Sequence, residues 1–237
     1  MLFLHEVHRV VGAKEDEFDA AYREGWMPIL ATSSDARLLW YMRLAHGSGA
    51  AYVVVTVTAL ADMSAFDALS TRVRRGDLAA WSTELDAMRH GTDAKLLVPV
   101  EWSPLQEVDL SSVPTGDEDH EPTVYMEDTA WPYRGGLPAY LTLAGTLYQH
   151  QTLGRSKEAG RSIIEMEAAF QPVFGTHDTT EVILWQKVVD HKALERLLTH
   201  ETPAHLKGPG TWMTDALAVR DQWESRLLRT VPWSPLD

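Results

Sequence analysis

The sequence contains no cysteine, so disulfide bonds, thiolate nucleophiles and cysteine-ligated zinc or iron–sulfur centres are all excluded. It also has no uninterrupted apolar run near the ~20 residues that a helix needs to cross a bilayer. The first six residues lack the basic region and the small-residue cleavage site of a secretory signal. We therefore expect a cytoplasmic protein with no membrane partner.

Positive charge is also scarce. The chain has 21 Lys and Arg against 34 Asp and Glu, which gives a formal net charge of −13. Binding to a phosphate backbone requires a dense Lys and Arg surface, so we expect no nucleic acid partner. The sequence has no nucleophile elbow, phosphate-binding loop or dinucleotide fingerprint, and nucleotide cofactors are therefore not supported.

What the chain does have is enough apolar material for a packed core, with 45% hydrophobic and 9% aromatic residues. One segment is an exception. Residues 106–121 contain six acidic and no basic side chains, together with Ser, Pro and Gly. Such a composition buries too little apolar area to order itself, so the segment is interpreted as a solvated linker, with cation binding as the alternative.

The most informative feature is an internal repeat. Residues 79–105 align without gaps with residues 210–236 at 11 of 27 positions, and both stretches end in Trp-Ser-Pro-Leu. The chain is therefore interpreted as two divergent copies of one unit, at 1–105 and 122–237, joined by the acidic linker.

Hydrophobic periodicity predicts the same element order in both copies: strand, helix, a pair of strands, a helical segment and a final strand. In the first copy the expected strands and helices cover 2–11, 18–29, 37–45, 51–59, a helical segment capped by Asp62, and 94–100. In the second copy they cover 123–130, a helix entered through Gly135 and Gly136, 161–170, 181–189, helices to about 220, and 226–231.

This β-α-β-β-α-β order is the ferredoxin-like motif, an α+β fold whose antiparallel sheet has helices on one face only. The other face of each sheet needs a cover, and two fused copies can cover each other. We therefore predict two sheets packed into an α+β barrel, with the space between them as the ligand cavity.

With these repeats and their endings, Val100–Leu105 and Pro232–Leu236, the chain resembles a tandem NIPSNAP-like protein of the dimeric α+β barrel superfamily. The resemblance covers nearly everything except the linker. It implies the fold but carries no catalytic signature, because relatives include cofactor-free monooxygenases on aromatic substrates, lactone isomerases, haem-degrading oxygenases, haem enzymes and proteins that only bind.

Strand alternation nominates pocket residues, since the face that meets the helices should be uniformly apolar. Leu38, Trp40 and Met42 are assigned to that face, which points Tyr41 and Arg43 into the barrel. The same reasoning is applied to the other strands. The predicted catalytic residues are Glu6, Arg43, Glu165 and Glu167, and the predicted substrate-binding residues are His8, Tyr41, Tyr125, Glu127 and Trp185.

A cluster of Glu with His, Tyr and Arg suits general acid–base chemistry, because burial raises a carboxyl pKa and Arg can stabilise an enolate or phenolate. The leading hypothesis is an enzyme without a tightly bound cofactor, of isomerase, lyase or cofactor-free monooxygenase type, acting on a small hydrophobic cyclic or aromatic molecule. A non-catalytic binding or interaction module, in which the charged groups pair with each other, is the alternative. The chain is expected to be a monomer or homodimer.

Metal chemistry has weak sequence support. His5 and His8 lie three residues apart on a predicted strand, so their side chains point to opposite faces and cannot chelate one ion. No metal site is predicted. A haem-dependent enzyme, with a histidine as ligand, is the third hypothesis.

Overall fold

The computed structural model describes residues 1–115, 119–174, 180–204 and 207–237. The chain divides into two compact units, and each is described by itself. Unit 1 consists of 1–98, 107–124 and 227–237, and unit 2 of 99–106 and 125–226. Each Trp-Ser-Pro-Leu segment thus lies outside the unit that holds most of its own repeat.

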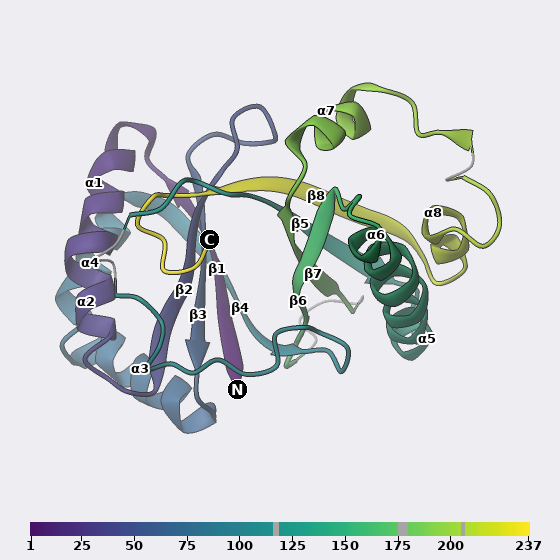
Figure 1. The fold of residues 1–237 in the computed structure, drawn as a ribbon. Helices are drawn as coiled ribbons and strands as arrows, with labels where there is room; N and C mark the ends of the chain where they lie inside the picture. The colour runs from purple at the N-terminus through teal and green to yellow at the C-terminus, as the bar shows by residue number, and fades with distance from the viewer. Residues whose placement is uncertain (116–118, 175–179, 205–206) are drawn as a thin grey trace. The chain divides into compact units, whose positions relative to one another are not determined.

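Unit 1 has helices on one face of an antiparallel sheet (Figure 1). The strands run in the order β4-β1-β3-β2, and the end of β8 pairs with β2. This is the ferredoxin-like order. Its elements are β1 (Leu2–Val10), η1 (Gly12–Lys14), α1 (Glu15–Ala20), η2 (Ala21–Trp26), α2 (Met27–Leu30), β2 (Ala36–Leu44), β3 (Val53–Leu60), α3 (Met63–Arg75), α4 (Ala79–Ala87) and β4 (Arg89–Pro99).

Unit 2 repeats this arrangement, with strand order β8-β5-β7-β6. The α+β fold class predicted from the sequence is confirmed. The elements are β5 (Val124–Pro132), α5 (Leu137–Leu143), η3 (Ala144–Gly154), α6 (Arg155–Glu158), β6 (Ile164–Pro172), β7 (Val182–Val188), α7 (His191–Thr199), α8 (Trp212–Asp215), η5 (Ala216–Ala218) and β8 (Arg220–Thr230).

The helix starts follow from local chemistry. Asp62 caps α3 as predicted, since its side chain accepts a hydrogen bond from the amide of Ala65 at 2.9 Å. Asp190 caps α7 through Ala193 in the same way, also at 2.9 Å. No helix among the described residues is both long and apolar enough to cross a membrane.

The last strand of each half begins earlier than predicted. β4 starts at Arg89 and β8 at Arg220, five and six residues before the expected starts at 94 and 226. Both strands open with mostly polar residues, so their first residues lack the apolar alternation that identifies a strand in a sequence.

A π-helical stretch interrupts the first helical segment of both units, as η2 and η3. The apolar stripe predicted the helices but not this widening. Stretches of π-helix are rare and occur frequently at functional sites. In unit 1, η2 begins two residues after Asp19 and carries Tyr22 and Arg23, and these three side chains become important below.

The predicted linker is not a free spacer over its described length. Leu110 and Val113 are buried, and Asp119 forms an ion pair with Arg23 of η2 at 2.9 Å. The backbone amide of His120 donates to the carbonyl of Pro232 at 2.8 Å. Its few apolar side chains and specific polar contacts hold it on unit 1, which average composition did not anticipate.

Candidate functional site

Unit 1 contains a pocket of about 340 Å³, at the small end of the roughly 300–1,000 Å³ typical of small-molecule sites. Charged side chains dominate its polar lining, and the C-terminal segment supplies an apolar wall. The lining residues are Asp19, Arg23, Arg43, Asp119, Pro122, Arg229, Thr230, Val231, Pro232 and Trp233.

Asp19 is the buried carboxylate of this pocket, with 8% of its surface exposed. Its Oδ1 accepts a hydrogen bond from the Tyr41 hydroxyl at 2.5 Å, and its Oδ2 accepts one from Nη2 of Arg43. Burial and the neighbouring Asp19 raise the pKa of Tyr41 well above its usual value, so the hydroxyl keeps its proton and remains a donor. The two donors therefore fix the orientation of the carboxylate.

Arg43 carries the compensating charge. Burial acts to lower its pKa, but the hydrogen bond and the charge of Asp19, together with Glu15, outweigh that effect and the pKa rises. The guanidinium of Arg43 also lies 3.8 Å from the carboxylate of Glu15 and 3.7 Å from that of Asp16, both of which are on α1 together with Asp19. The guanidinium is thus permanently charged and held at the pocket.

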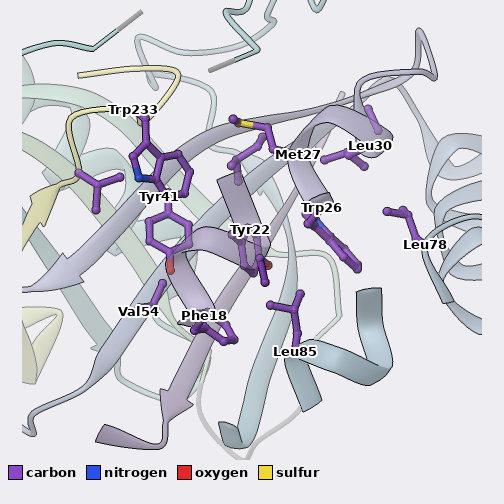
Figure 2. Close-up of a cluster of buried hydrophobic side chains, with 14 of the residues drawn as sticks. Phe18, Tyr22, Trp26, Met27, Leu30, Tyr41, Val54, Leu78, Leu85 and Trp233 are labelled. Carbon is purple, nitrogen blue, oxygen red and sulfur yellow. The ribbon is translucent and has the colours of Figure 1, made fainter. Parts of the chain in front are cut away.

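An aromatic stack forms the apolar side. The ring centroids of Tyr41 and Trp233 are 4.5 Å apart, and those of Tyr41 and Tyr22 are 5.1 Å apart. Figure 2 shows Trp233 above the ring of Tyr41, with Tyr22 to its side. The amide of Tyr41 donates to Oγ of Ser234 at 3.1 Å, which holds the Trp-Ser-Pro-Leu segment against β2.

Beneath this stack, His8 occupies a fully buried polar site. Arg89 Nη1 lies 2.7 Å from Nδ1 of His8, and because a guanidinium only donates, that nitrogen must be an acceptor. The other ring nitrogen lies 3.1 Å from Thr56 Oγ1 and 3.4 Å from the Tyr22 hydroxyl. Burial, then the charge of Arg89, lowers the pKa of His8 to about 3, so His8 is neutral.

Glu6 lies on the same face of β1. Burial raises its pKa, while Arg89 and His5 partly offset that rise. Unit 2 has an acid at the equivalent position of its first strand. Glu6 of β1 is the Cα partner of Thr56 in β3, and Asp128 of β5 is in the same way the Cα partner of Leu184 in β7. Burial raises the pKa of Asp128 as well. A half-buried acid in the first strand is thus common to both units.

The predicted facing of Tyr41 and Arg43 is wrong. A β-bulge at Leu39 shifts the register of β2 against β3, so both residues point toward the helices instead of the opposite face. Glu6 and His8 also face the helices. The assumption that this face is uniformly apolar failed because Thr56, Tyr22 and Arg89 satisfy the polar groups there.

The predicted facing of Tyr125, Glu127 and Trp185 agrees with the structure. They lie opposite the helix-facing residues of β5 and β7, and the rings of Tyr125 and Trp185 are 5.9 Å apart. Glu127 is 1% exposed and pairs with Arg226 at 2.5 Å. A carboxylate so engaged fits a structural pair, and the catalytic or binding role of these residues stays a prediction.

Glu165 and Glu167, predicted as paired carboxylates, lie at a β-bulge of β6. Glu165 forms an ion pair with Lys157 at 2.6 Å, and that lysine is largely exposed. Glu167 is the bulge residue of β6 and has no Cα partner in the pairing with β7. The bulge breaks the two-residue repeat on which the prediction depended.

No group of three or more His, Asp or Glu side chains that could hold a metal ion exists among the described residues. Three charged residues that line the pocket were not predicted from the sequence: Asp19, Asp119 and Arg229. One signal was available for Asp19, because it lies one helical turn before Tyr22 and two turns before Trp26, at the edge of the apolar stripe.

No protein-family model and no curated protein matches this sequence. Solved structures do match. A presumed monooxygenase from Lactobacillus acidophilus covers 99% of this chain and 97% of its own, with a TM-score of 0.57 and 10% identity. An anthrone oxidase-like protein covers 97% and 91%, with a TM-score of 0.60 and 8% identity.

A NIPSNAP domain protein from Burkholderia xenovorans also matches. It is 24% identical and covers 43% of this chain and 96% of its own, with a TM-score of 0.37. At these identities the two whole-chain matches establish the fold and nothing about the reaction. The chain thus shares the α+β fold of those two structures.

Proposed function

We propose that the protein is a small-molecule enzyme that removes a proton from a hydrophobic cyclic or aromatic substrate bound in the unit 1 pocket. The observation that carries this proposal is the placement of a buried carboxylate, Asp19, and a fixed guanidinium, Arg43, in one pocket beside the indole of Trp233. The likeness in fold to a presumed monooxygenase and an anthrone oxidase-like protein is consistent with it.

The chemistry assigns one role to each group. The Asp19 carboxylate accepts a proton from an acidic C–H or phenolic O–H, and the electron pair stays on the substrate as an enolate or phenolate. Arg43 stabilises the negative charge that develops. A carboxylate has about four lone-pair sites, so the hydrogen bonds from Tyr41 and Arg43 leave room for that proton.

Proton abstraction is the first step of all three predicted reaction classes. An isomerase returns the proton at another carbon, and a lyase expels a leaving group. A cofactor-free monooxygenase transfers electrons from the anion to molecular oxygen, which is then a second substrate. We also propose that the second half arose by tandem duplication and lacks a site of this kind.

Hydrogen–deuterium exchange into carbon acids tests the proposal without knowledge of the product. The protein is incubated in D₂O with cyclohexanone and α-tetralone, and loss of the α-proton signals is followed by NMR. Wild type should accelerate exchange, and Asp19→Asn should lose that acceleration by a factor of about 10² to 10⁴. Asp67→Asn is the matched control, an exposed aspartate on α3 that does not line the pocket.

The alternative is a binding module, favoured by the fact that both oxygens of Asp19 already have donors. It would be established if wild type bound such molecules without accelerating exchange. Full exchange activity in Asp19→Asn would show that another group is the base. Haem-dependent chemistry stays a prediction, for which a Soret band in the purified protein is the test.

A further inference from the structure

Two arginines face each other across strands at the pocket. Arg43 on β2 and Arg229 on β8 are Cα partners in the antiparallel pairing, so their side chains lie on the same face, and both line the pocket. Like charges directly opposite in a sheet are destabilising unless an anion compensates them. The pair therefore requires an explanation.

The charges at the pocket are unequally compensated. Arg43 has Asp19, Glu15 and Asp16 within 4 Å. Arg229 is exposed and forms no ion pair with any residue in the described part of the chain. One guanidinium thus projects into the pocket, opposite another, with no described carboxylate as its partner.

The remaining lining restricts what the anion can be. A guanidinium presents a planar fork that matches a carboxylate through two parallel hydrogen bonds. Trp233, Val231 and Pro232 line the same pocket as an apolar wall, and its volume of about 340 Å³ suits a small ring. A flat ring bearing a carboxylate satisfies both parts of the lining together.

We infer that the substrate is a small aromatic or cyclic carboxylate whose carboxylate group is bound by Arg229 and whose ring lies against Trp233. This inference rests on the proposed function, because it names the substrate class of the same pocket. Arg229 then anchors the molecule, and Asp19 and Arg43 act on the ring.

Calorimetry with benzoate tests this anchor, with benzamide as the neutral analogue of the same shape and inorganic phosphate as a tetrahedral anion. Wild type should bind benzoate at least 10-fold more tightly than benzamide or phosphate. Arg229→Gln should weaken benzoate binding at least 10-fold, and Arg229→Lys should weaken it less because the charge remains. Arg74→Gln, an exposed arginine on α3, is the control for net charge and should leave binding unchanged.

Equal binding of benzoate and benzamide would overturn the inference, as would equal loss of affinity in Arg229→Gln and Arg74→Gln. Phosphate binding as tight as that of benzoate would show that Arg229 recognises a tetrahedral anion and not specifically a carboxylate, which would also overturn the inference. The two proposals fail in different ways. Benzoate binding through Arg229 without any exchange activity would sink only the enzyme proposal, and exchange of neutral ketones without an anion preference would sink only the inference.

Discussion

The two units have the same strand order and anchor their closing segments identically, yet only unit 1 places charge beneath its helices at the second strand. Ser234 Oγ accepts from the amide of Tyr41, and Ser103 Oγ accepts from the amide of Ala169 at the equivalent position. The side chains on that scaffold differ. By register, Ala169 in unit 2 replaces Tyr41.

The packing of the closing tryptophans follows from that difference. Trp233 lies on the ring of Tyr41, whereas Trp102 packs on Gly145 and donates to the carbonyl of Leu141 at 2.9 Å. The closing tryptophan thus packs on the second strand in unit 1 and on the first helical segment in unit 2. The comparison shows that two units with the same strand order and the same anchoring contacts can differ in their chemistry through a few side chains.

The largest expected difference between the two units is in their stability at acidic pH. Ala130 in unit 2 occupies the position of His8, which is neutral with a pKa near 3 instead of about 6.5. Between pH 3 and 6.5 the folded state thus binds fewer protons than the unfolded state. The contribution of His8 to the free energy of unfolding is therefore fully present above pH 6.5 and is lost as the pH falls toward 3. The loss for wild type is about 3 kcal/mol at pH 4 and about 4 kcal/mol at pH 3.

Urea denaturation between pH 4 and 7 measures this effect, and hydrogen exchange read by mass spectrometry assigns it to a unit. His8→Gln, whose amide can accept from Arg89 and donate to Thr56, should flatten the pH dependence. Equal acid sensitivity in both units, or an unchanged slope in His8→Gln, would contradict the role of His8.

The closing tryptophans give the next largest effect. Trp233→Ala should destabilise the protein by about 3 to 5 kcal/mol, because a buried ring that stacks on Tyr41 is removed and leaves a cavity. Trp102→Ala should cost less, since Trp102 is only half-buried. Thermal and urea unfolding of both variants provide the ranking, and the reverse order would show that the unit 2 contact is the stronger one.

The glycines within the two π-helical stretches should show the smallest effect, and a similar one in both units. A Cβ on Gly25 would lie 2.4 Å from ring atoms of Trp81, and a Cβ on Gly145 would lie 2.6 Å from Cδ1 of Trp102. Each Gly→Ala change should cost about 1 to 3 kcal/mol through overpacking. Gly208→Ala, with no atom within 4 Å of its added Cβ, is the control that should be near neutral in urea denaturation.

The sequence by itself determined the element order, the helix cap at Asp62 and the fold class. These depend on local periodicity and on repeated motifs, which a single chain displays directly. The facing of Tyr125, Glu127 and Trp185 also followed from simple alternation, because β5 pairs with β7 without a break in register.

Only the tertiary structure decided where the candidate site lies. The bulges at Leu39 and Glu167 reverse the alternation partway along β2 and β6, and an extra residue in a strand leaves no mark in the hydrophobic pattern. Asp19 and Arg229 are 210 residues apart in the sequence, so their meeting in one pocket depends on the C-terminal segment packing in unit 1. Long-range packing of this kind has no local signal, because it depends on which surfaces remain uncovered once the sheets have formed.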